Sequence, residues 1–148
     1  MDHASLSQLV SELFLAIQAL GGYEPPAVAP EIHQVPQAFI QQEFCSRPCS
    51  FRALYDPVRG VYIDEAFDLI NDPLARSILL HELVHHAQAV SRRFESTADP
   101  CVRYNRAEAE AYLIQNRYLM SLNVAHRVAM SGWFMRCRAE EVPEPKKS

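Results

Sequence analysis

With 148 residues, 49% of them apolar, the chain has the size of one ordinary domain and can bury a core of its own. Its 18 acidic and 14 basic residues give a net charge of −4 and form no basic stripe, which excludes nucleic acid as an expected partner. No stretch approaches the ~20 consecutive apolar residues of a membrane span, so no span is expected. We predict one domain over residues 1–148, of which 139–148 form a solvated, frayed tail.

The N-terminal segment carries its apolar residues at helical spacing and predicts an amphipathic helix. A secretion signal is the alternative, but the segment lacks the basic stretch that precedes the apolar region of such a signal. Gly21-Gly22 is expected to end the helix, because glycine readily adopts the positive φ of a helix C-terminus. The apolar residues at this spacing are Leu6, Leu9, Val10, Leu13, Phe14, Ile17 and Leu20.

Three short segments, 31–35, 50–55 and 60–64, have the composition of strands. The sequence Asp-Pro-Val-Arg-Gly at 56–60 is a turn signal that joins the second segment to the third. One or two helical turns are expected over 37–44, between the first strand and the second. The chain therefore builds a small three-stranded sheet after its first helix.

Helical patterns fill the rest of the chain. Asp72-Pro73 combines an N-cap residue with proline at the first helical position, which predicts a helix that continues to about residue 91. Two further helices are expected over 102–122 and 124–137. A helix, a small sheet and three more helices make the predicted fold an α+β domain.

Four cysteines, Cys45, Cys49, Cys101 and Cys137, are an even number in a small chain. They fit two disulfides formed in an oxidising compartment, as in a periplasmic or secreted protein, and they allow three pairings. Four reduced thiols in a cytoplasmic protein are the alternative. A zinc ribbon is disfavoured, because Cys45 and Cys49 have three residues between them and no second closely spaced pair follows.

His81-Glu82-Leu83-Val84-His85 places two histidines four residues apart on a predicted helix. Side chains at this spacing share one helical face, with Cβ atoms about 6 Å apart, so both imidazoles can bind one metal ion. Glu82 can then act as general base on a metal-bound water. The pattern predicts a Zn²⁺ site with Glu82 as the catalytic residue; two surface histidines beside a glutamate are the structural alternative.

A zinc hydrolase needs a third protein ligand, and the next predicted helix offers Glu108 and Glu110. The two side chains point about 200° apart around the helix, so only one can face the metal. We predict Glu108, which lies on the face that is expected to be buried, and keep Glu110 as the alternative. A capping box formed by Asn105 and Glu108 is the structural alternative. The face of Glu108 also carries Tyr112, Gln115, Leu119 and Leu122.

These two segments resemble the gluzincins, whose His-Glu-x-x-His motif is followed on a later helix by Glu-x-x-Ala and an acidic or polar residue. The later segment here is Glu108-Ala109-Glu110-Ala111-Tyr112. In thermolysin-like and membrane-protease gluzincins and in ImmA-like domains its first glutamate is the ligand, which again implies Glu108. The chain is most similar to small bacterial zincin-like domains that share His-Glu-Leu-Val-His-His and a later Glu-x-Glu-Ala-Tyr. The resemblance covers about residues 60–120 and few positions, and Tyr112 departs from the aspartate that supports a zinc histidine in thermolysin-like enzymes.

The resemblance implies a minimal zincin-like fold and a zinc metallopeptidase that cleaves a peptide or protein substrate. A strand near the catalytic helix, 61–64, would pair with the extended substrate; an ordinary core strand is the alternative. A hydrogen-bond donor for the transition-state oxyanion is also needed, and spacing does not select one. The possible donors are Tyr104, Tyr112, Tyr118, His86 and His126.

Two other functions compete with the peptidase. One is a zincin-fold binding or regulatory module that retains zinc but has no general proteolytic activity, since the chain has little sequence left for a substrate-binding lobe. The other is a purely structural zinc site, which Glu82 disfavours because such a site needs a fourth protein ligand in place of water.

Overall fold

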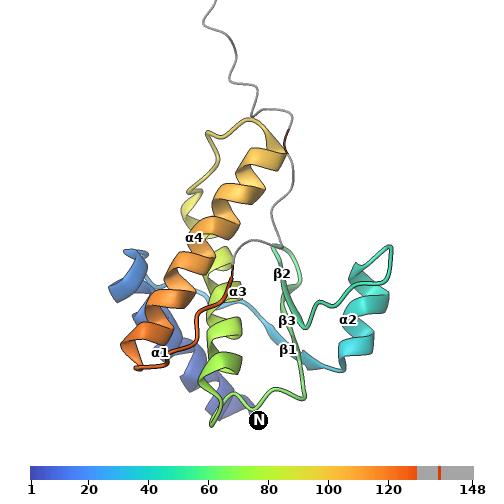
Figure 1. Cartoon of the computed structure of the whole chain (residues 1–148), viewed down its shortest axis with the longest axis vertical. Helices are drawn as coiled ribbons and strands as arrows, with labels where there is room; N and C mark the ends of the chain where they lie inside the picture. Colours follow the sequence, from blue (N-terminus) through green and yellow to red (C-terminus); the bar gives the residue numbers. More distant parts are fainter. Residues whose placement is uncertain (130–136, 138–148) are drawn as a thin grey trace, which may run out of the picture.

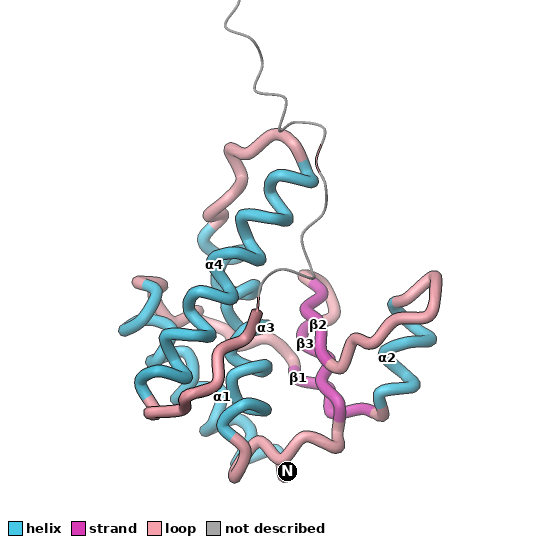
Figure 2. Tube along the Cα trace, viewed as in Figure 1, coloured by secondary structure: helices cyan, strands magenta, loops and turns pink. Residues whose placement is uncertain are grey.

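The computed structural model describes residues 1–129 and 137. Its elements form an α+β domain with one small sheet, which confirms the predicted fold class (Figure 1). The short helix over 37–44 lies on one side of the sheet and the other helices lie on the opposite side (Figure 2). In chain order the elements are α1 (His3–Gly21), β1 (Ile32–Val35), α2 (Gln37–Phe44), β2 (Ala53–Asp56), β3 (Gly60–Asp64), α3 (Pro73–Ser91) and α4 (Pro100–Ser121).

The sheet has the order β1-β3-β2, with β1 parallel and β2 antiparallel to β3. The central strand β3 is buried along its whole length. Asp56 closes the β2–β3 turn, because its Oδ1 accepts hydrogen bonds from the backbone N–H groups of Val58 and Arg59, both at 2.8 Å. Gly60 has a φ of 98°, and a Cβ there would lie 2.3 Å from the carbonyl oxygen of Glu31. Glycine is therefore required where β3 begins beside β1.

Helix α3 begins where the sequence predicts. Asp72 accepts a hydrogen bond from the backbone N–H of Leu74 at 2.9 Å, and Pro73 occupies the first turn. The helix ends at Ser91, followed by Arg92 in the left-handed conformation. It packs against α1, α4 and the sheet, so most of its circumference is buried, including the face that carries His81 and Glu82.

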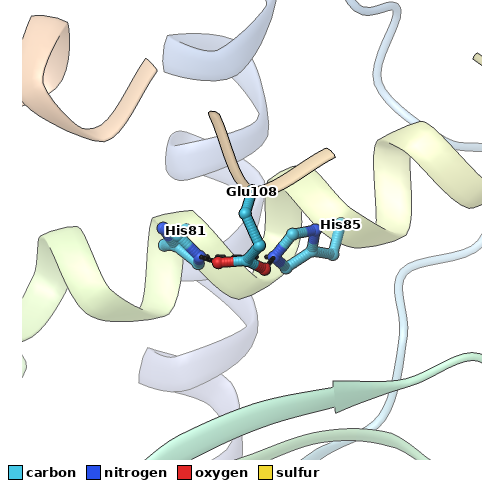
Figure 3. Close-up of side chains that lie close together, drawn as sticks. All are labelled: His81, His85 and Glu108. Atoms are coloured by element: carbon cyan, nitrogen blue, oxygen red, sulfur yellow. Dashed lines mark hydrogen bonds and ion pairs between the residues drawn. The ribbon is translucent and has the colours of Figure 1, made fainter. Parts of the chain in front are cut away.

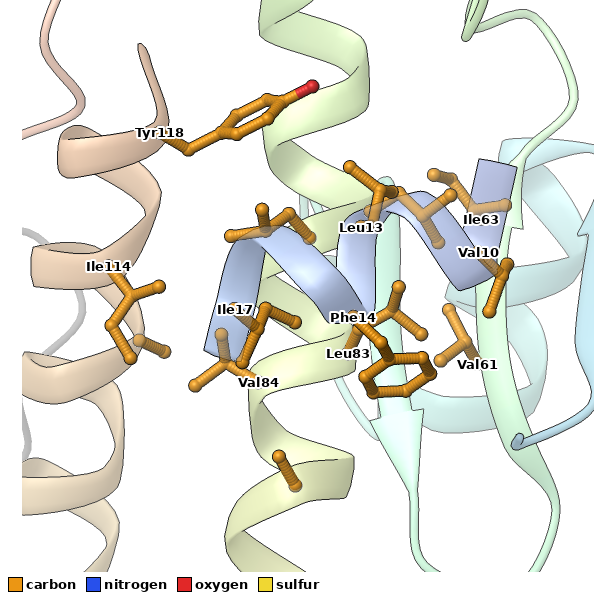
Figure 4. Packing of buried hydrophobic residues seen from close by; sticks show 14 of the residues in the cluster. Val10, Leu13, Phe14, Ile17, Val61, Ile63, Leu83, Val84, Ile114 and Tyr118 are labelled. Atoms are coloured by element: carbon orange, nitrogen blue, oxygen red, sulfur yellow. The ribbon is translucent and has the colours of Figure 1, made fainter. Parts of the chain in front are cut away.

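Helix α1 buries one face in the core, as its amphipathic pattern predicts. The buried residues of this face pack against apolar residues of β3, α3 and α4 (Figure 4). By length and composition alone, the same helix could also cross a membrane. In the fold, 28% of its 18-residue apolar stretch is buried. It is the one such helix in the described part of the chain. The buried face consists of Leu6, Val10, Leu13, Phe14 and Ile17.

Helix α4 starts at Pro100, slightly earlier than predicted, because Asp99 accepts hydrogen bonds from the N–H groups of Cys101 and Val102. The predicted closing helix over 124–137 is wrong for residues 124–129, which have no helical structure. The physical reason is a pair of hydrogen bonds between Asn116 and the backbone N–H and C=O of Val128, at 2.8 and 3.0 Å. These bonds take the place of helical ones.

Two disulfides link Cys45 to Cys49 and Cys101 to Cys137. The first closes the loop between α2 and β2, and the second ties the C-terminal region to the first turn of α4. The remainder of the predicted closing helix, residues 130–136, and the predicted tail at 139–148 lie outside the described residues.

Candidate metal centre

His81 and His85 lie one turn apart on the same face of α3. Their Nε2 atoms are 3.2 Å apart, and their ring centroids are 4.9 Å apart with an interplanar angle of 79°. Both rings point toward α4 (Figure 3). The helical spacing that the sequence supplies therefore brings two imidazole nitrogens to one point.

Glu108 of α4 completes a group of three metal-binding side chains. Its Oε1 lies 2.5 Å from Nε2 of His85, and its Oε2 lies 3.2 Å from Nε2 of His81. The ligand atoms of the three residues all lie within 4.8 Å of one another, and the carboxylate sits between the two rings (Figure 3). This group could hold a metal ion.

Glu110 lies elsewhere. Its carboxylate accepts a short hydrogen bond from the hydroxyl of Tyr23, accepts a second from Nε2 of Gln88 at 3.2 Å, and lies 3.5 Å from Nε of Arg93. The capping-box alternative for Glu108 also fails, because α4 starts at Pro100 and Glu108 lies well inside it.

His85 and Glu108 shift each other's pKa in opposite directions. Burial opposes protonation of His85, but the hydrogen bond that protonated His85 donates to Glu108 and the negative charges of Glu82 and Glu108 outweigh it and raise the pKa of His85 to about 9. Burial disfavours the Glu108 carboxylate, yet hydrogen bonds from His81 and His85 lower its pKa to about 2. The site therefore favours positive charge between its three ligand atoms, whether a proton or a cation supplies it.

Glu82 is buried and borders the same space without belonging to the ligand group. Burial raises the pKa of its carboxyl group, and the charges of His81 and His85 oppose that rise. A carboxylate whose pKa is raised binds a proton more readily, which suits a group that accepts and returns one.

Each histidine has a glutamine at its outer nitrogen. Nδ1 of His81 lies 2.9 Å from Oε1 of Gln115, and Nδ1 of His85 lies 2.8 Å from Oε1 of Gln88. The ring of Tyr112 packs against that of His81, with centroids 4.5 Å apart. The sequence placed Gln115 on the face of Glu108, but gave no signal for its contact with His81.

The residues of the whole domain match a known family. Residues 2–142 correspond to the family described as Domain of unknown function (DUF6647). The chain belongs to this family. No curated protein and no solved structure matches it.

The DUF6647 domain has a cavity of about 610 Å³ beside the three ligand residues, lined also by Glu82, by residues of β2 and by aromatic side chains. Of the five possible oxyanion donors, Tyr104 and Tyr112 line this cavity. Tyr118 accepts a hydrogen bond from Arg76 on another face, and His86 contacts the hydroxyl of Tyr55. His126 is exposed and lies outside the cavity.

The predicted substrate strand at 61–64 is wrong for the DUF6647 domain, because β3 already pairs with β1 on one side and β2 on the other. Its position in the middle of the sheet makes it the core strand that was the alternative. The edge strand beside the cavity is β2, whose four residues all line it. The order of the strands determines that β2 has a free edge and β3 does not, and local sequence patterns do not predict that order.

Proposed function

We propose that this domain is a zinc-dependent hydrolase that cleaves peptide bonds. The observation that carries the proposal is the convergence of His81, His85 and Glu108 beside the buried Glu82, at the wall of a cavity. Two imidazole nitrogens and one carboxylate are a donor set that suits zinc and leaves a fourth position open. A structural site would need a fourth protein ligand, and no other histidine, cysteine or acidic residue joins this group in the described residues.

A bound zinc ion supplies a Lewis acid that lowers the pKa of water toward ~7 and polarises the substrate carbonyl. Glu82 accepts the proton of the attacking water and returns it to the leaving nitrogen. Burial raises the pKa of Glu82, and a raised pKa makes its carboxylate a stronger base toward the attacking water. Tyr104 and Tyr112 supply candidate donors to the developing oxyanion. Burial, followed by the charges of Glu108 and Glu82, raises the pKa of both phenols, so both hydroxyls keep their protons.

The outer edge of β2 offers backbone groups for an extended substrate. The N–H of Asp64 donates to the carbonyl oxygen of Arg52 at 2.8 Å, so these two residues form a hydrogen-bonded pair. Such pairs alternate along antiparallel strands, and the register then leaves the N–H and C=O groups of Ala53 and Tyr55 pointing away from β3. A peptide that adds to this edge would lie along the cavity beside the metal site.

We also propose that the domain works in an oxidising compartment such as the periplasm or the extracellular space. Two disulfides are compatible with export, because such bonds persist where thiols are not kept reduced.

The test is the variant Glu82→Gln, compared with wild type and with Glu12→Gln, which changes a carboxylate on an exposed part of α1. Cleavage of an unstructured protein such as casein, and zinc content, are measured for all three. We expect Glu82→Gln to lose about 10²–10⁴-fold in turnover while keeping its zinc, and Glu12→Gln to match wild type. Zinc-loaded wild-type protein that cleaves nothing, or a Glu82→Gln protein that cleaves as fast as wild type, overturns the peptidase and favours a binding module.

A further inference from the structure

The amide of Gln115 has one orientation that satisfies its neighbours. The carbonyl oxygen of Leu74 can only accept, so the hydroxyl of Ser77, 2.7 Å away, donates to it. Oγ of Ser77 then accepts from Nε2 of Gln115 at 3.0 Å. This leaves Oε1 of Gln115 facing Nδ1 of His81 at 2.9 Å, and an amide oxygen can only accept. Nδ1 of His81 therefore carries a hydrogen.

An independent chain of contacts fixes Gln88 in the same way. Its Nε2 donates to the carbonyl oxygen of Ala107 at 2.9 Å and to Oε1 of Glu110 at 3.2 Å, and both of these atoms are acceptors. Oε1 of Gln88 is then left to accept from Nδ1 of His85 at 2.8 Å. Nδ1 of His85 also carries a hydrogen, and Nε2 of each neutral ring is the nitrogen with a free electron pair.

We propose that Gln88 and Gln115 are positioning residues that select the metal-binding tautomer of the two histidines. A backbone carbonyl group orients each amide, directly for Gln88 and through Ser77 for Gln115. The amide oxygen then accepts a hydrogen bond from Nδ1 of one ring. Both Nε2 electron pairs are thereby directed at the point that Glu108 also faces. This inference rests on the proposed metal site and concerns how that site is built.

The choice of neutral amides has an electrostatic consequence. Glu82 and Glu108 carry two negative charges, which a divalent cation balances. Carboxylates in place of the two glutamines would add two more buried negative charges, because Gln88 and Gln115 are 6% and 2% exposed. The amides orient both rings without the cost of burying these charges. A cation at the site also keeps more of its positive charge than it would beside two further carboxylates.

The test measures zinc affinity, by competition with a chelator, and the ¹H–¹⁵N spectrum of the imidazole nitrogens in Gln88→Met and Gln115→Met. We expect each variant to lose about 10- to 100-fold in zinc affinity. The Nδ1–H signal should change for His85 alone in the first variant and for His81 alone in the second. Gln115→Glu keeps an acceptor and should stay within about tenfold of wild type. The matched control is Gln41→Met, because Gln41 also donates to a backbone carbonyl, at 2.7 Å, away from the metal site.

Ser77→Ala provides a second approach if Gln115→Met does not fold. It removes the acceptor that orients Gln115 and leaves the glutamine in place, so the signal of His81 should change and that of His85 should not. Wild-type zinc affinity and unchanged Nδ1–H signals in the glutamine variants overturn the inference, even if the wild-type protein cleaves peptides. Zinc-loaded wild-type protein without hydrolytic activity overturns the peptidase and leaves the role of the glutamines standing.

Discussion

Oε1 of Glu108 lies 2.5 Å from Nε2 of His85, although the two residues belong to different helices. The contact exists because α4 returns alongside α3 after a short loop and presents the carboxylate to the two rings (Figure 3). A carboxylate facing two nitrogen electron pairs is stable only with positive charge between them. The contact lies at the centre of the proposed metal site.

Replacing Glu108 and Glu110 in turn tests which carboxylate is the ligand. Glu108→Ala removes a group that faces both histidines, so zinc affinity should fall by more than about 100-fold. Glu110→Ala removes an anchor of Gln88 and should cost less than about 100-fold. Chelator competition measures both. Full zinc affinity in Glu108→Ala, or a larger loss in Glu110→Ala, contradicts the assignment.

The metal-free protein should become less stable as the pH rises from about 6.5 to 9. The folded protein raises the pKa of His85 from 6.5 to about 9, so its stabilising contribution is complete below pH 6.5 and is lost as the pH passes through 9. The loss in the free energy of unfolding should be about 3 kcal/mol. Urea unfolding at several pH values measures it.

Zinc should reverse this trend, because protons compete with the cation for the same ligands. At a fixed excess of free zinc, stability should therefore rise over the same pH range. The variant His85→Gln lacks the titrating group and serves as the control for the metal-free series. A metal-free wild-type protein whose stability is constant from pH 6.5 to 9 would show that His85 has no raised pKa.

Local signals in the sequence were sufficient for much of the fold. Asp72-Pro73 marks the start of α3 because the N-cap hydrogen bond and the proline act within one turn. Helical geometry also separates the two carboxylates, since Glu108 faces the two histidines and Glu110 contacts Tyr23 and Arg93.

Features that depend on distant partners could not be predicted in the same way. The position of β2 at the edge depends on sheet order, and residues 124–129 leave the helical conformation because Asn116 binds their backbone. The contact of Gln115 with His81 requires the packing of α3 against α4, and so does the orientation of the Gln88 amide, which donates to Ala107 and Glu110 of α4. Spacing along α3 brings Gln88 beside His85 but does not predict these contacts between helices.

The proposal that a substrate peptide pairs with the outer edge of β2 can be tested with Ala53→Pro. This change removes the N–H group that we propose for substrate binding and leaves the bonds between β2 and β3 intact, because that group points away from β3. The loss of one hydrogen bond should raise KM about 3- to 10-fold with unchanged zinc content. Ala53→Val retains the N–H and should bind substrate like wild type. An equal rise in KM for both variants would argue for a side-chain effect and against strand addition.

The two disulfides should contribute unequally to stability. Cys101–Cys137 closes a loop with a sequence separation of 36, and Cys45–Cys49 closes one with a separation of 4. Loop-closure entropy predicts a loss of about 4 kcal/mol for Cys101→Ser with Cys137→Ser, against about 2 kcal/mol for Cys45→Ser with Cys49→Ser. Chemical unfolding of both double variants gives the comparison. A larger loss from opening the short loop would contradict the predicted order.

The most direct measurement is the metal content of wild-type protein purified without chelators, together with zinc uptake by the stripped protein. We predict one zinc ion per chain, and uptake that is abolished when His81, His85 or Glu108 is replaced by alanine. Protein that contains no stoichiometric metal and takes up none from added zinc would contradict the metal site and the peptidase that depends on it.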